Sequence, residues 1–211
     1  MTIGLFPLNL VMLPSAQLPL HIFEPRYKQL INECVNESRA FGINLVEGTH
    51  MHGIGCTATV MRVLQRYADG RMDVIVQGGR RYRVLDVQKN VAPYVVADVE
   101  EVADIDAPID LVLLKECANL FSTLLSLVYP GREPLKIQEY FDTSHDVSYI
   151  MALKSGLDTK QKQHLLELTD ENERIEYLRD HLERMIPTIE REQLVQRVIM
   201  NDGYIIPDRS S

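Results

Sequence analysis

A proline-rich apolar ribbon opens the chain and gives way to a helical pattern near residue 25. Proline lacks a backbone donor and suits strand edges and turns, so Pro7 and Pro14 divide "IGLFPLNLVMLP" into two extended pieces, and "LPLHIFE" is a third. Pro25 then fits the first turn of a helix. The apolar residues that follow repeat at helical spacing and predict an amphipathic helix: Tyr27, Leu30, Ile31, Cys34 and Val35.

From residue 40 to residue 101 the pattern alternates, which predicts a mostly antiparallel sheet. "AFGINLVE" and "GCTATVMRVLQRY" are two strands, and the Asp69-Gly70 pair predicts a hairpin turn after the second. Three more strands are predicted after this turn: "RMDVIVQ", "RRYRVLDVQ" and "PYVVADVEEV". Gly78-Gly79 breaks or bulges the chain between the first two of them. Short strands of this kind need closure or a covering helix, so we expect a small, partly open barrel.

After residue 109 the pattern becomes helical. A long apolar helix ends at Pro130, and "DVSYIMALKSG" and "DTKQKQHLLELT" predict two further helices. Asp170, with Glu173 three residues later, is a capping-type start for a last helix that Pro187 kinks or ends. The fold class is therefore α+β, with a β-rich domain over residues 1–103 and an α-helical domain over residues 104–211.

Composition narrows the class of protein. A chain of 211 residues with 45% hydrophobic content can bury a sizeable core. Its three cysteines form neither a disulfide framework nor a CxxC motif, which favours reduced thiols. No basic segment precedes the apolar ribbon, and its prolines would interrupt a signal or spanning helix, so we expect a cytoplasmic protein with no membrane association. The net charge of −8 argues against a nucleic acid as the main partner.

Several segments, in this order, carry a resemblance to a known family: "FPLNLVMLPSAQLPLHIFEPRYKQLINECV", "FGINLVE", "GCTATVMRVLQRYADGRMDVIVQGGRRYRV", "PYVVADVEE" and "LLELTDENERIEYLRDHLERMI". The chain resembles the N-terminal, substrate-binding domain of ATP-dependent Lon proteases. That resemblance implies a twisted, barrel-like β subdomain akin to the PUA fold, followed by a helical bundle. It also implies recognition of unfolded or damaged polypeptides, or assembly with a partner protein.

The catalytic parts of such a protease are not in this sequence. A Walker A motif, G-x-x-x-x-G-K-[ST], does not occur, and a Ser-Lys peptidase domain has no room after residue 203. We therefore expect a stand-alone recognition domain that hydrolyses neither ATP nor peptides, has no catalytic residues and needs no cofactor. The oligomeric state cannot be read from the sequence.

Arginines concentrate in the second half of the predicted hairpin, around Arg80, Arg81 and Arg83. One interpretation is an RNA-binding patch on a PUA-like fold. The other is a charge device that protects strand edges and pairs with the acidic residues between Asp98 and Asp106. We favour the second interpretation, because few aromatic residues lie among the arginines and the overall charge is acidic.

"HIFEPRY" also has two interpretations. Phe23 and Tyr27 could present themselves to a peptide, or Phe23 could be buried in the core while Glu24 and Arg26 fix the strand-to-helix turn. The structural interpretation is favoured, because apolar residues at regular spacing are usually core residues. A peptide would then bind in a groove between the barrel and the helical half, or add to an open strand edge through main-chain hydrogen bonds.

Two further chemistries receive little support. His50 and His52 share one face of an extended segment and could meet one metal ion, but no third ligand is visible and no metal site is predicted. A Cys-His hydrolase built on Cys34, Cys56 or Cys117 stays open, although buried cysteines acting as small hydrophobes are far commoner. The sequence thus favours a non-catalytic protein-interaction module, with an RNA-binding module as the alternative.

Overall fold

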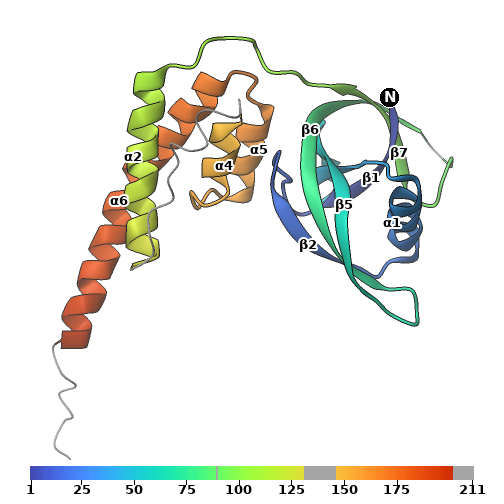
Figure 1. Ribbon diagram of the computed structural model, residues 1–211, viewed down its shortest axis with the longest axis horizontal. Coiled ribbons are helices and arrows are strands. Elements are labelled where there is room, and N and C mark those ends of the chain that lie inside the picture. The colour runs from blue at the N-terminus through green and yellow to red at the C-terminus, as the bar shows by residue number, and fades with distance from the viewer. Residues whose placement is uncertain (89, 131–145, 202–211) are drawn as a thin grey trace, which may run out of the picture.

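The structure is a computed structural model that describes residues 1–88, 90–130 and 146–201. It has the shape of an arch, with a barrel and a helical half joined by the extended segment 102–110 (Figure 1). The barrel half contains β1 (Thr2–Leu8), β2 (Gln17–Ile22), α1 (Pro25–Glu37), β3 (Phe41–Glu47), β4 (His50–Met51), β5 (Ile54–Arg66), β6 (Met72–Gln88) and β7 (Val95–Glu101). The helical half contains α2 (Leu111–Val128), α4 (Val147–Ala152), α5 (Thr159–Glu167) and α6 (Glu171–Asn201).

The sheet closes into a ring, because β1 pairs with β7 on one side and with β3 on the other. The order around the ring is β1-β7-β6-β5-β3, and only the β1–β3 pair among these is parallel. β2 lies outside the ring and pairs with the first part of β6. The predicted α+β fold with a barrel-like sheet is confirmed, and the ring of β1, β7, β6, β5 and β3 is closed rather than partly open. The proposed domain division at residue 103 remains a prediction.

The predicted break at Pro7 was wrong, whereas the predicted bulge at Gly78-Gly79 is confirmed. β1 continues through Pro7 to Leu8, because its pairing with β7 ends at Leu5 and the missing amide of Pro7 then lies at a free edge. β6 runs through Gly78-Gly79 as one strand, and a register shift against β5 forms a bulge there, which was the other predicted outcome. A Cβ atom at Gly78 would clash with the carbonyl oxygen of Leu13.

The predicted amphipathic helix is confirmed as α1, which begins at Pro25 and buries Tyr27, Leu30, Ile31 and Cys34 in the barrel. The alternating pattern along the strands places one face of the sheet in the core. At the start of β6, for example, every second residue is buried. The residues that α1 and the strands bury form the barrel part of the main apolar core.

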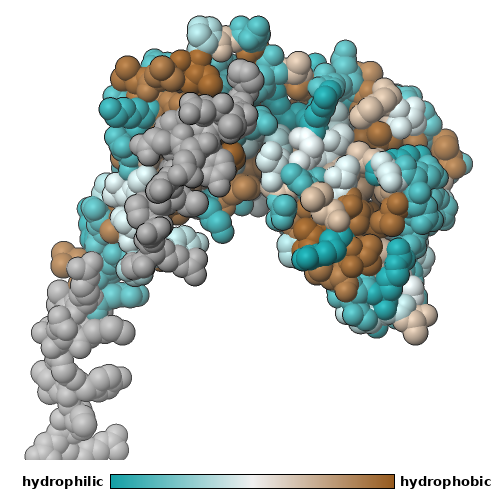
Figure 2. Space-filling view, in the orientation of Figure 1, coloured by the Kyte–Doolittle hydropathy of each residue, from teal (hydrophilic) through white to brown (hydrophobic). Residues whose placement is uncertain are grey.

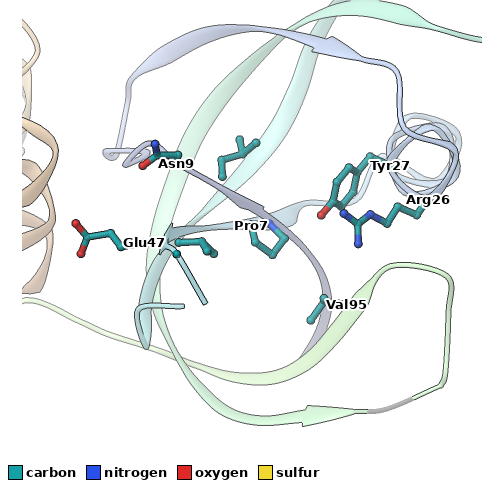
Figure 3. A pocket seen from close by; sticks show the side chains of 9 residues that line it. Pro7, Asn9, Arg26, Tyr27, Glu47 and Val95 are labelled. Carbon is teal, nitrogen blue, oxygen red and sulfur yellow. The ribbon is translucent and has the colours of Figure 1, made fainter. Parts of the chain in front are cut away.

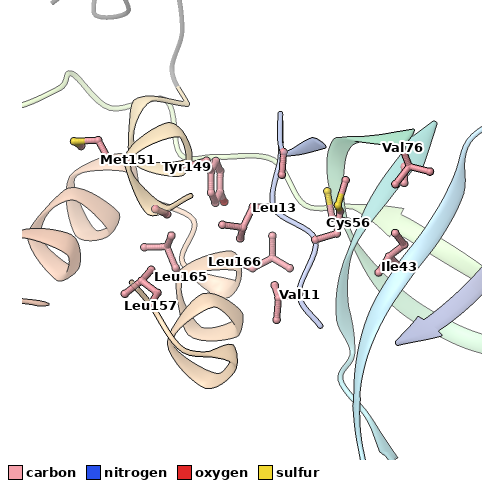
Figure 4. Close-up of a cluster of buried hydrophobic side chains, with 14 of the residues drawn as sticks. Val11, Leu13, Ile43, Cys56, Val76, Tyr149, Met151, Leu157, Leu165 and Leu166 are labelled. Carbon is pink, nitrogen blue, oxygen red and sulfur yellow. The ribbon is translucent and has the colours of Figure 1, made fainter. Parts of the chain in front are cut away.

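The segment between β1 and β2 is a buried wedge between the two halves. Val11 and Leu13 lie between the barrel residues Ile43 and Val76 and the helical residues around Leu166, and all belong to one core cluster (Figure 4). The sequence pattern treated this segment as an extended piece of the sheet. Its apolar side chains instead pack between β5 and α5, and thereby fix how the two halves meet.

A buried ion-pair network reinforces this contact. Arg174 on α6 is 0% exposed, and its guanidinium donates hydrogen bonds to both oxygens of Asp104 in the connecting segment, to Glu171 at 2.7 Å and to the carbonyl oxygen of Leu168 at 2.8 Å. It also stacks over the ring of Tyr149, 4.6 Å from the ring centroid. The connecting segment is thus held to the helical half by charge as well as by packing.

The barrel joins the same network through Arg81 on β6. Arg81 is 4% exposed and donates to the carbonyl oxygens of Leu166, at 2.9 Å, and Leu168, at 2.6 Å. Its other terminal nitrogen donates to the Asp104 carboxylate that Arg174 also binds. We call Arg81, Asp104, Glu171 and Arg174 the junction network, since they come from the barrel, the connecting segment and α6.

The long helices pack on each other. α2 is long and apolar enough to cross a membrane by length and composition, with a mean hydropathy of 1.6, but its buried face packs on α6 and makes it part of the core: Leu114, Cys117, Ala118, Phe121, Leu124 and Leu125. α6 passes through Pro187 as one helix, so of the two predicted outcomes, a kink or an end, the end does not occur. Ile186 and Ile189 pack against the core on either side of Pro187, and this packing offsets the lost amide bond.

The junction network predicts a large loss of stability when its central cation is removed. Arg174→Met keeps much of the side-chain length but leaves Asp104 and Glu171 facing an apolar side chain, which should lower the free energy of unfolding by about 3–5 kcal/mol. Urea unfolding followed by circular dichroism measures this. Arg179→Met on the same helix is the matched control, because Arg179 pairs with Glu176 and Asp180 at the surface, where a lost pair matters little. Equal losses in the two variants would contradict the account.

Candidate functional site

β2 presents an open edge. In the described part of the chain β2 pairs only with β6, so its other side has no strand. Figure 1 shows β2 on the side of the barrel turned towards the helical half, under the arch. The start of the strand is anchored, because Ser15 donates to Gly78 and Gly78 donates to Ala16 just before β2 begins.

The direction of each amide in β2 follows from this anchor. The Gly78 amide donates to the carbonyl oxygen of Ala16, so that carbonyl faces β6, and the period of two in an antiparallel ladder then turns the amides of Leu18, Leu20 and Ile22 towards β6. The amides of Gln17 and His21 point to the open side, and Pro19 between them has no amide to offer. The open edge therefore has two free donors separated by a proline.

Aromatic side chains surround the end of this edge. The His21 ring lies 6.0 Å from the Phe23 ring and 6.1 Å from the Tyr67 ring. His21 and Tyr67 both hydrogen-bond Asp73, at 2.6 and 2.7 Å, and these bonds hold the pKa of Asp73 below its usual range. We call His21, Phe23, Tyr67 and Asp73 the β2 cluster. Its hydrogen bonds fix the orientation of two aromatic rings at the surface.

The two candidate peptide-binding residues lie in different environments. Phe23 is 59% exposed, so the expectation that it is buried in the core was wrong. Ile22 takes the buried position at the end of β2, and the next residue must then point outwards. Tyr27 is buried, and its ring stacks on Phe6 with centroids 4.1 Å apart. Phe23 and Tyr27 therefore do not form one peptide-binding surface.

Apolar surface gathers over the part of the barrel where Figure 1 draws β2 and β5, and Figure 2 shows it bordered by hydrophilic residues. Phe23 after β2, Met61 and Leu64 on β5, and Tyr67 after β5 are exposed. An apolar surface with a polar border is typical of a protein-binding site. The open edge and this surface together are the candidate site.

A pocket also lies between the two halves, where the sequence placed a binding groove. Its volume is about 240 Å³, and charged side chains line much of it, with Arg80, Glu101, Asp104 and Asp146 among them. Ligand pockets usually measure about 300–1,000 Å³. The pocket is smaller than this, and Arg81 and Asp104 of the junction network line it, so the open edge of β2 is the better candidate for a polypeptide.

The arginines of the alternative RNA site are only partly at the surface. Arg81 is buried in the junction network, whereas Arg80 and Arg83 are exposed. Arg80 donates to both carboxylate oxygens of Glu101, at 3.0 and 2.8 Å. The predicted pairing with the acidic segment is thus confirmed for Arg80 and Arg81. The bulge at Gly78-Gly79 shifts the register of "RRYR" and buries Arg81, a change that simple alternation does not predict.

His52, the second residue of the histidine pair, lies close to two carboxylates. The His50 and His52 rings are 5.1 Å apart, and His52 lies 3.0 Å from a carboxylate oxygen of Glu47 and 3.7 Å from one of Glu167. Within residues 1–88, 90–130 and 146–201, no group of three His, Cys, Asp or Glu side chains is placed to hold a metal ion. His52 therefore serves to link β4 to the helical half.

The three cysteines are free thiols in apolar surroundings. Burial raises the pKa of Cys34 to about 11 and that of both Cys56 and Cys117 to about 12. A thiol with such a pKa holds almost no nucleophilic thiolate at neutral pH. The geometry favours cysteines that act as small hydrophobes.

The described residues thus combine a closed ring of strands, an outer strand β2 with one open edge, and a helical half. The family model that matches is the ATP-dependent protease La (LON) substrate-binding domain, over residues 2–184. The chain belongs to this family, which confirms the resemblance found in the sequence.

Curated relatives are full proteases of which the chain covers a small part. Lon protease 1 of Hydrogenovibrio crunogenus is 25% identical over 201 residues, which span 89% of this chain and 24% of the relative. The Lon protease of Dictyoglomus thermophilum is 23% identical over 202 residues, or 91% of this chain and 25% of the relative. The chain thus spans about a quarter of the length of these relatives.

Solved structures support the fold over nearly the whole chain. A Lon N-terminal domain protein from Xanthomonas campestris has a TM-score of 0.64 at 24% identity and covers 84% of this chain and 96% of its own. The N-terminal domain of Mycobacterium avium complex Lon protease has a TM-score of 0.62 at 21% identity, with 87% and 98% covered. The arrangement of barrel and helices is therefore that of Lon N-terminal domains.

The buried cysteines predict slow thiol chemistry. At mildly alkaline pH an aromatic disulfide reagent should label Cys34, Cys56 and Cys117 slowly in the folded protein and all three rapidly in urea, because unfolding removes the burial that raises their pKa. Absorbance of the released thiolate follows the reaction. A thiol that reacts rapidly in the folded protein would contradict this account and would favour a cysteine nucleophile.

Proposed function

We propose that the chain is a non-catalytic recognition domain that works in the cytoplasm and binds unfolded polypeptides or exposed apolar segments. The observation that carries the proposal is the open edge of β2 beside exposed apolar side chains. An extended polypeptide would add to this edge as a further strand. Main-chain hydrogen bonds do not depend on sequence, and this mode therefore suits a domain that must accept many substrates.

The side chains next to the edge add a preference for apolar segments. Phe23 and Pro19 are exposed beside the outward amides of Gln17 and His21, so alternate side chains of a bound strand would contact them. Pro19 removes one donor from the middle of the edge. This loss weakens pairing between two β2 edges and thereby protects the protein against self-association.

The absence of catalysis is part of the proposal. It is supported by the raised pKa values of the three thiols and by the family description, which names substrate binding. The relatives are proteases, and this chain corresponds to about a quarter of their length. A partner protein with an apolar extended segment would use the same edge as an unfolded substrate.

The alternative RNA function would depend on Arg80 and Arg83, the exposed members of the predicted patch. Arg80 is already paired with Glu101, which lowers its availability to phosphate. Polypeptide binding through main-chain bonds and apolar contacts should depend little on salt, whereas RNA binding should fall steeply as salt rises. Salt dependence therefore separates the two functions.

The test is fluorescence anisotropy of a labelled, permanently unfolded polypeptide, titrated with the protein at low and at moderate salt. We expect saturable binding that survives the added salt, and no comparable binding of single-stranded RNA. Binding of RNA alone, lost on addition of salt, would contradict the proposal. If neither probe bound, the open-edge mode would be contradicted, and a folded partner protein would be the remaining candidate ligand.

A matched pair of variants assigns the binding to β2. His21→Pro removes an outward amide but no bond to β6, so it should weaken polypeptide binding several-fold, as expected for one hydrogen bond of about 1 kcal/mol, with little change in the melting temperature. His21→Ala removes the same imidazole and keeps the amide. If His21→Ala weakens binding as much as His21→Pro, the side chain rather than the strand edge is responsible.

A further inference from the structure

The small pocket between the two halves lies close to the point where β2 begins. Pro14, three residues before β2, and Gly79 on β6 both line it. Gln17, the first residue of β2, pairs with Gln77, and the three residue steps between Pro14 and Gln17 limit their distance to about 11 Å. A polypeptide added to the open edge of β2 would therefore pass close to this pocket.

The hydroxyl of Tyr149 is a buried polar atom without a partner in this lining. Tyr149 on α4 is 1% exposed, and its hydroxyl makes no hydrogen bond among the residues that the structure describes. The Arg174 guanidinium lies 4.6 Å from the ring centroid and holds the ring in place, and Figure 4 shows the ring directed from α4 towards Leu13, the neighbour of Pro14. Burial raises the pKa of Tyr149, so the hydroxyl stays protonated and can both donate and accept. A buried hydroxyl without a partner is costly, which points to a ligand atom.

One carboxylate of the lining has no counter-charge. The junction network balances its own charges, with two arginines and two carboxylates, and Arg80 pairs with Glu101 at 2.8 Å. Asp146 is the remaining charged residue of the lining. In the parts of the chain that the structure describes, its side chain forms no ion pair and, at the N-cap of α4, no cap hydrogen bond. The pocket therefore has one negative charge in excess.

The charge of the surrounding chain has the same sign. Residues 1–103 contain ten basic and ten acidic residues, so the whole net charge of −8 belongs to residues 104–211. The pocket thus lies between a neutral barrel and an acidic helical half. Such a charge distribution attracts cations.

The size of the pocket suits one side chain rather than a whole small molecule. Its 240 Å³ is the space of about eight water molecules at about 30 Å³ each. A lysine side chain has a compact ammonium group with three donors on a flexible four-carbon stem. The stem would contact Val102 and Ala103, and the ammonium group would donate to Asp146 and Tyr149.

A larger pocket on the barrel offers a ligand less. It measures about 710 Å³ and lies between the ends of β1 and β3 and the start of α1 (Figure 3). Its charged side chains are already paired, because Arg26 binds Glu24 at 2.8 Å and Glu47 binds His52 at 3.0 Å. The unpaired carboxylate and the unpartnered hydroxyl both belong to the smaller pocket.

We propose that the smaller pocket binds a lysine side chain of a polypeptide that lies on the β2 edge, with Asp146 and Tyr149 as the acceptors for its ammonium group. The inference rests on the proposed function, since the lysine belongs to a polypeptide already held by that edge. Main-chain bonding lets a polypeptide shift along the edge until a lysine reaches the pocket. The pocket gives apolar segments that contain a lysine an advantage over wholly apolar ones.

The test compares two labelled decapeptides by fluorescence anisotropy. They share one apolar sequence and differ at a single central position, which is lysine in one and norleucine in the other. Norleucine keeps the four-carbon stem and removes the ammonium group. We expect the lysine peptide to bind the unchanged protein at least fivefold more tightly, and equal binding of the two would overturn the inference.

Two variants assign this preference to the pocket. Asp146→Asn removes the unpaired charge and should bring the lysine peptide down to the affinity of the norleucine peptide. Tyr149→Phe removes one acceptor and should weaken the lysine peptide several-fold. Both should leave the norleucine peptide unchanged. Because the hydroxyl has no partner in the free protein, Tyr149→Phe should also leave the melting temperature as it was, and a fall of several degrees would contradict this assignment.

The matched controls are Asp106→Asn and Tyr177→Phe. Asp106 is exposed in the connecting segment, and Tyr177 lies on α6 outside the lining, so neither change should alter the ratio of lysine to norleucine binding. An equal loss in Asp106→Asn and Asp146→Asn would assign the preference to the overall acidic charge and overturn the inference. Equal binding of both peptides, together with binding of the unfolded polypeptide, would overturn the lysine pocket and still support the proposed function. Failure of every polypeptide to bind would overturn both.

Discussion

Arg174 carries a full positive charge in the interior, and a guanidinium there is stable only when its donors are paired. Its partners come from three places: Asp104 in the connecting segment, Glu171 at the start of α6 and the carbonyl of Leu168 before it. Asp104 in turn binds Arg81 from the barrel. One buried charge therefore ties the barrel, the connecting segment and the helical half together, and the arch depends on it.

The apolar wedge around Leu13 acts with this network. Packing alone resists separation of the two halves but permits sliding, whereas directed hydrogen bonds at Asp104 fix orientation as well. The result is a rigid arch with β2 on its inner side and an edge that no other described strand covers (Figure 1). A binding edge held in place by the fold loses little freedom when a polypeptide adds to it, which favours affinity.

Local patterns in the sequence predicted much of the fold. Alternation gave the strands, proline at the first turn gave the start of α1, and the Asp69-Gly70 turn between β5 and β6 was also read correctly, since Gly70 has the positive φ of 82° that such a turn needs. These features depend on neighbours in the chain. The resemblance to Lon substrate-binding domains then supplied the order of barrel and helices.

The candidate site was harder to predict because it depends on contacts between distant segments. Arg81 was expected at the surface, but the bulge beside it and the carbonyls of Leu166 and Leu168, more than eighty residues away, place it inside. Phe23 was assigned to the core because nothing in the chain shows that Ile22 takes the buried position.

The central claim is that a polypeptide adds to the open edge of β2, and amide hydrogen exchange measured residue by residue tests it most directly. In the free protein the outward amides of Gln17 and His21 should exchange rapidly, while that of Leu20, bonded to β6, should be protected. Addition of an unfolded polypeptide should slow exchange at Gln17 and His21 and leave Leu20 as it was. Binding without any change at Gln17 and His21 would contradict the claim and place the polypeptide elsewhere on the molecule.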